Sequence, residues 1–148
     1  MPILTASVAV ASAGDSQMID LTPQVQAVLD QHRYREGQAL VFVSGSTAGI
    51  TTVEFEPGLQ QDLPAAFERL APRDLHYAHE QTWHDDNGHS HVRASLLGPS
   101  LVVPFADGRL LLGTWQQIVL IDFDTRPRRR QIVVQLSGER ADAGGAQP

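Results

Sequence analysis

The chain has 148 residues, of which 42% are hydrophobic and 19% charged, values typical of one soluble globular domain. It contains no cysteine, which excludes disulfides, a thiolate nucleophile and a cysteine-ligated zinc site. A formal net charge of −6 argues against a general nucleic-acid-binding protein, and the absence of lysine excludes Schiff-base and phosphate-loop lysines.

The chain begins with strand-like sequence followed by a helix. Residues 3–11 alternate in the manner of a β-strand, and a turn at 13–16 leads to a short strand at 17–20, so we expect a hairpin. The Thr-Pro pair at 22–23 supplies an N-cap and a first helical position, with apolar residues following three and four apart. Gly37 is expected to mark the end of this helix.

Two apolar runs and a second helix follow. Residues 39–43 are continuously apolar, which predicts a strand buried on both faces. The loop at 44–49 is rich in glycine and hydroxyl side chains, and 50–55 resumes an extended pattern. Apolar residues at helical spacing over 59–70, closed by Pro72, predict a helix.

The stretch 83–100 combines unusual polar density with apolar flanks. It holds three of the six histidines, two adjacent aspartates and an arginine. A core element would not tolerate so many ionisable groups without partners. We therefore expect this stretch to form the wall of a pocket, with a polar surface loop as the alternative.

The last third of the chain is predicted to form mainly β-strands. Residues 101–104 and 109–113 flank Asp107-Gly108, a strong hairpin signal. Further strands are predicted at 114–123 and 131–136.

Strands therefore lie mainly toward both ends of the chain, with helices between them and no βαβ rhythm, which predicts an α+β fold. We expect one domain over residues 1–140 and a flexible tail at 141–148. No window approaches the roughly 20 apolar residues of a membrane span, and the start does not resemble a signal peptide. We therefore expect a cytoplasmic protein without membrane or nucleic-acid partners.

Three side chains are candidates for a metal or acid/base site. His89 and His91 are spaced i, i+2, so on an extended segment both point the same way, whereas on a helix they diverge by about 200°. Together with Glu54 they would form a three-ligand set with an open position for water or phosphate. If a helix starts near Ser90, one histidine turns away and only a His–Glu acid/base pair is left.

Several other residues are candidates for binding an anion. Ser46 and Thr47 lie in a loop that can offer hydroxyl and backbone N–H groups. Arg93, with Ser95 beside it, presents a forked donor set, and its partner is either a bound phosphate or a carboxylate of the protein. Polar and aromatic side chains at the start of a late strand complete the candidates: Trp115, Gln116 and Gln117.

Longer motifs in the chain resemble a known family. The segments 45–54, 56–59, 87–100, 108–109 and 112–117 resemble the YjbQ-type family, identified with secondary thiamine-phosphate synthase activity. The resemblance extends over residues 3 to 139, and the Ala-Ser-Leu-Leu-Gly-Pro-Ser and Leu-Gly-Thr-Trp-Gln motifs are long enough to be specific.

The resemblance implies a compact α+β domain with a large mixed sheet, two or three helices, and assembly as a homotrimer. It also implies a pocket that contains Glu54 and His91, with Asn87 among the residues around the ligand. One branch of the family has a histidine where this chain has Gly45, so His89 is the candidate to replace it.

Two functions follow as hypotheses. The first is an enzyme that joins hydroxymethylpyrimidine diphosphate to thiazole phosphate and releases pyrophosphate, with Glu54, His89 and His91 as catalytic residues and Mg²⁺ or Zn²⁺ as cofactor. This activity resembles a side reaction, so the physiological substrate stays open. The alternative is a homotrimer that binds a metal or a phosphometabolite without dedicated catalysis.

Overall fold

A computed structural model describes residues 1–141 of the chain. The elements follow in the order β1 (Ile3–Ser12), β2 (Gln17–Asp20), α1 (Thr22–Gln31), β3 (Tyr34–Ser44), β4 (Ala48–Val53), α2 (Leu59–Leu70), α3 (His79–Trp83), α4 (Gly88–Leu97), β5 (Ser100–Ala106), β6 (Arg109–Leu110), β7 (Gln117–Asp122) and β8 (Arg128–Arg140). The predicted tail at 141–148 lies, apart from Ala141, outside the described part. No helix in residues 1–141 has the length and apolar character needed to cross a membrane.

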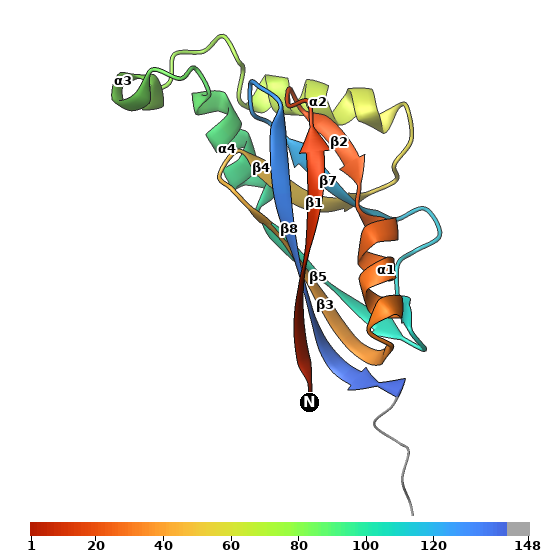
Figure 1. Cartoon of the computed structure of the whole chain (residues 1–148). Helices are drawn as coiled ribbons and strands as arrows, with labels where there is room; N and C mark the ends of the chain where they lie inside the picture. Colours follow the sequence, from red (N-terminus) through yellow and green to blue (C-terminus); the bar gives the residue numbers. More distant parts are fainter. Residues whose placement is uncertain (142–148) are drawn as a thin grey trace, which may run out of the picture.

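The α+β fold class is confirmed, but the strands form two antiparallel sheets instead of one large mixed sheet (Figure 1). The larger sheet has the strand order β1-β8-β3-β5-β6, and the smaller has the order β2-β7-β4. The predicted hairpin at Asp107-Gly108 is confirmed, since β5 pairs with β6 and both turn residues have the positive φ that such a turn needs, 51° and 75°.

The hairpin expected between the first two strands does not form. β1 pairs with β8 in the larger sheet, whereas β2 pairs with β7 in the smaller one. The turn between them contains three successive residues with positive φ, Gly14, Asp15 and Ser16, which carry the chain from one sheet to the other. The Asp15 and Ser16 N–H groups donate to the carbonyls of Asp124 and Asp122, each at 2.7 Å.

The core lies between the two sheets, and further apolar residues pack outside the smaller one. β7 is buried on both faces: Ile118 and Leu120 belong to the main core, whereas Val119 and Ile121 pack with residues of α2 and α4. α1 closes the main core with three buried side chains, Val25, Val28 and Leu29.

Gly37 does not end helix α1, because the chain passes from His32 directly into β3. Gly37 lies within β3 opposite Gly138 of β8. A Cβ atom on Gly37 would overlap the Ser137 carbonyl, so glycine is required here by the close approach of two strands.

The outer face of the larger sheet is not covered by any described helix. In β3, Val41 and Val43 are buried, but Phe42 on the opposite face is 38% exposed, so the prediction of burial on both faces is wrong for a single chain. Val102 of β5 is 53% exposed on the same face, since it pairs with Leu40. With Leu40 and Val133, which pair with Val102 and Phe42, these residues form an apolar patch on this face, bordered by polar side chains such as Gln38 and Gln135.

A buried ionic network ties the sheets together at one end. Arg130 of β8 donates through Nε and Nη2 to both carboxylate oxygens of Asp122 of β7, at 2.7 and 2.8 Å. Its Nη2 also donates to Thr47 Oγ1 at 2.7 Å, and that hydroxyl donates to Asp124 at 3.0 Å. The β3–β4 loop at 45–47 is thereby fixed against both sheets.

Asp122→Asn should lower the free energy of unfolding by about 3 kcal/mol, because it removes the nearer counter-charge of the buried Arg130 guanidinium and leaves only Asp124, 3.9 Å away. Urea unfolding followed by circular dichroism measures the change. Asp107→Asn is the control, since Asp107 pairs with Arg35 at the surface with 88% of its side chain exposed. Equal stability of the two variants would contradict the importance assigned to the network.

Candidate functional site

Residues 89–91 are helical, so the histidines separate. Helix α4 begins at Gly88, whose N–H donates to the Glu80 carboxylate at 2.7 Å. A Cβ atom at Gly88 would lie 2.5 Å from Tyr77 Cβ, so this start of the helix needs glycine. His89 and His91 then point about 200° apart. The extended geometry needed for a shared metal is absent, and the helical alternative is the one observed.

His91 is half-buried in a polar cluster beside the β3–β4 loop. Its ring centroid lies 4.4 Å from that of His79, and the Ser46 backbone is a hydrogen-bond partner. Burial and then the neighbouring His79 lower the pKa of His91, although Asp85 and Asp124 act in the opposite direction. A neutral imidazole that is still reachable from solvent can accept a proton near pH 7.

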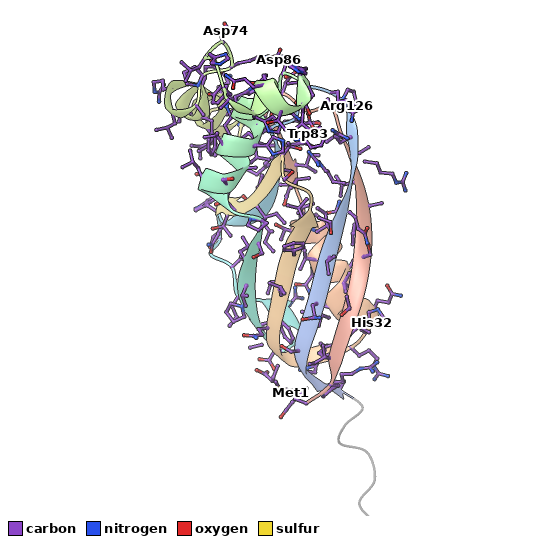
Figure 2. The ribbon with its side chains drawn as sticks, turned by 90° about the vertical axis from the view of Figure 1, so that its left-hand side faces the viewer. Met1, His32, Asp74, Trp83, Asp86 and Arg126 are labelled. Atoms are coloured by element: carbon purple, nitrogen blue, oxygen red, sulfur yellow. The ribbon has the colours of Figure 1, made fainter. Side chains whose placement is uncertain are left out.

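His79 is held in turn by residues at the end of the segment 79–87. Its Nε2 lies 3.3 Å from Asp85 Oδ1. With its amide nitrogen facing these groups, the buried Asn87 donates to Asp85 at 2.9 Å and to His79 at 3.1 Å. Asn87 is therefore a positioning residue for the His79–His91 pair. Figure 2 shows Trp83 and Asp86 at this end of the molecule, opposite Met1 and His32.

The two predicted loop residues, Ser46 and Thr47, differ in their exposure to solvent. Thr47 is buried, and both of its hydrogen-bonding functions are used by the ionic network. Ser46 is exposed and, with Ser95, lines a cavity of about 160 Å³ between the loop and α4. Ser95 Oγ donates to the His91 carbonyl at 2.8 Å. Ser46 and Ser95 are thus the hydroxyls that a ligand near α4 can reach.

The other face of α4 holds His89 and Arg93. His89 is 3% exposed, and its pKa is lowered by burial and by the charges of Arg93 and Arg73. Arg93 is also buried; it donates to the Ala71 carbonyl at 3.0 Å and forms an ion pair with Glu68. Of the two predicted partners of Arg93, the structure contains the carboxylate.

Glu54 lies in a third group at the far end of β4. It is exposed and lies six positions after Ala48, which adjoins the β3–β4 loop, so roughly 20 Å of extended chain separates the two. Gln116 donates to Thr52 at 3.1 Å, and Gln117 accepts from the Phe55 N–H at 2.8 Å. The side chains gathered here are Glu54, Trp115, Gln116 and Gln117, of which Trp115 is 71% exposed and lies before β7.

The predicted residues therefore do not meet in one chain. Glu54, His89 and His91 lie in three separate places, and within residues 1–141 no three His, Asp or Glu side chains are grouped to hold a metal. The donor set of one chain does not fit a resident Mg²⁺ or Zn²⁺.

Sequence reasoning missed His79, Glu68 and Arg130, each of which partners a predicted residue or loop. His79 lies twelve residues before His91 and reaches it only because the intervening segment folds back. Arg130 belongs to an arginine-rich run that resembles a solvated turn. A buried strand, β7, leading into Asp122 and Asp124 was the available signal for a nearby cation.

Comparison with known proteins agrees with this architecture. A family model described as "UPF0047 protein YjbQ-like" matches residues 6–139. The chain belongs to this family. A UPF0047 protein of Archaeoglobus fulgidus is 38% identical over 119 residues, covering 80% of this chain and 90% of the relative. One from Methanothermobacter thermautotrophicus is 36% identical, covering 94% and 95%.

Solved structures of YjbQ-like proteins share the fold. The crystal structure of a YbjQ-like protein of unknown function from Sulfolobus solfataricus has a TM-score of 0.88 and 32% identity, covering 93% of this chain and 99% of that one. A YjbQ/UPF0047 protein from Clostridium acetobutylicum has a TM-score of 0.82 with 32% identity, covering 89% and 99%.

His89→Asn should weaken the dependence of stability on pH. In the wild type the lowered pKa of His89 means that the unfolded chain takes up a proton below about pH 6.5 that the folded chain does not. The free energy of unfolding should therefore fall as pH drops below 6.5, with His89 contributing up to about 1.4 kcal/mol per pH unit.

Denaturant unfolding at several pH values from 5 to 8 measures this slope. His84→Asn is the matched control, since His84 is exposed with φ of 56°, a conformation that asparagine also adopts. A slope that is the same in both variants would exclude a special environment for His89.

Proposed function

We propose that the protein is an enzyme acting on a small phosphate-containing molecule, with His91 as the group that transfers a proton. The activity expected first is the thiamine-phosphate synthase-like reaction, in which hydroxymethylpyrimidine diphosphate and thiazole phosphate combine and pyrophosphate leaves. The physiological substrate belongs to the same chemical class, a phosphate ester or diphosphate.

The observation that carries this proposal is the environment of His91. Its ring is half-buried, its pKa is lowered, and it packs against His79, which Asp85 and Asn87 hold in place. The exposed Ser46 hydroxyl offers a donor on the loop beside it. This arrangement suits proton transfer next to a bound anion.

We further propose that the working site forms between copies in a homotrimer. Val102 of the exposed face also lines a cavity of about 390 Å³ between β4 and β5, together with Leu97, Leu101 and Leu111. This apolar area needs cover, and a second copy supplies it. Glu54 lies about 20 Å along its own chain from the β3–β4 loop beside His91, so the glutamate that reaches His91 belongs to a partner subunit in this proposal.

His91→Gln should reduce product formation by about 100-fold or more, because the proton-transferring group is lost. The assay follows phosphate-ester product and released pyrophosphate as enzyme concentration rises. His32→Gln is the control, since His32 lies toward the opposite end of the molecule (Figure 2). Unchanged turnover in His91→Gln would remove the catalytic proposal. Ligand binding without turnover in the wild type would favour a phosphometabolite-binding trimer.

Val102→Arg should dissociate the assembly, because it places a charge in the apolar face of the larger sheet. Sedimentation should give a mass three times the chain mass of 16.1 kDa for the wild type and the single chain mass for the variant. Leu70→Arg is the control, since Leu70 is 69% exposed on α2, away from this face. A wild type that sediments as a monomer at micromolar concentration would contradict the trimer.

A further inference from the structure

A second polar cavity lies on the face of α4 that points away from His91. Its volume is about 180 Å³, enough for a small anion or a few water molecules. Two arginines and a histidine line it together with polar groups of the β1–β2 turn and of α2: Arg93, Arg73, His89, Ser16, Asp15 and Glu68. The active site proposed above uses none of these side chains.

The Arg93 guanidinium in this cavity is buried and anchored, whereas its carboxylate partner is exposed. Arg93 has 7% of its side chain exposed and is anchored through Nε to the Ala71 carbonyl at 3.0 Å. Its partner Glu68 has 53% of its side chain exposed. The second pair, Arg73 with Asp15 at 2.9 Å, is exposed on both sides. An exposed carboxylate can turn into solvent, whereas the buried guanidinium cannot.

The β1–β2 turn places the Ser16 hydroxyl beside Arg93, and it does so with an unusual backbone conformation. Asp15 and Ser16 have φ of 51° and 66°, a conformation that side chains other than glycine rarely adopt in succession. The buried Ser16 hydroxyl lies 3.3 Å from Arg93 Nη1. Backbone outliers of this kind gather at ligand sites.

We propose that this cavity binds a phosphate dianion in place of the Glu68 carboxylate. The Nη2 group of Arg93, which now donates to Glu68, belongs to a guanidinium fork that suits a phosphate. Ser16 and Arg73 line the same cavity. In the absence of phosphate, the Glu68 carboxylate occupies the anion position. Phosphate binding would therefore break the Glu68–Arg93 ion pair that joins α2 to α4.

Glu68→Gln separates this proposal from a purely structural ion pair. The variant keeps a side-chain oxygen that can accept from the Arg73 backbone N–H, as Glu68 Oε1 does at 3.1 Å. It removes the negative charge that competes with phosphate. In chloride buffer the melting temperature should fall, because Arg93 is left buried without a counter-charge. Phosphate at equal ionic strength should restore it, and the Kd for inorganic phosphate should be about tenfold lower than in the wild type.

Asp62→Asn is the matched control, since it removes the same charge from the same helix without touching Arg93. In the Glu68→Gln background, Arg93→Lys should weaken phosphate binding about tenfold, because lysine keeps the charge but loses the fork. His91→Gln in that background should leave the Kd unchanged, which distinguishes this cavity from the proposed active site. Phosphate effects equal in Glu68→Gln and Asp62→Asn, or abolished by His91→Gln, would overturn the proposal.

Discussion

The paired hydrogen bonds between Arg130 and Asp122 are the constraint on which the rest of the site depends. They join a strand of the larger sheet to a strand of the smaller one where both are buried. Thr47 is drawn into the same network, which sets the β3–β4 loop against the beginning of α4. Asp124 has its pKa lowered, since hydrogen bonds from Thr125, Arg128 and Thr47 together outweigh the effect of burial. The ionic network therefore fixes the β3–β4 loop that lies beside His91.

The periodicity of helix α4 places its polar side chains on two different faces. His91 faces the loop and His79, whereas His89 and Arg93 face α2 and the β1–β2 turn. One short helix thus borders two cavities, of about 160 and 180 Å³, that share no lining residue. The same periodicity prevents His89 from joining His91, so the two histidines do not form the predicted set within one chain.

The fold class, the Asp107-Gly108 hairpin and helix α2 could be predicted from local sequence, because apolar spacing and turn residues determine them directly. The strand partners of β1 and β2 could not be predicted, since a turn signal does not reveal that the chain changes sheet. Helix α4 was ambiguous because Gly88 and its contact with Tyr77 decide where the helix starts. His79, Glu68 and Arg130 depend on contacts between distant segments, which no spacing rule encodes.

The central claim is that His91 of one subunit works with Glu54 of another, and mixing two inactive variants tests it most directly. Glu54→Gln and His91→Gln chains are unfolded together, refolded at equal ratio and assayed. If the site spans two copies, mixed trimers contain interfaces with both native residues, and about a quarter of wild-type activity should return. No recovery, with mixed trimers shown to form by native mass spectrometry, would contradict a shared site.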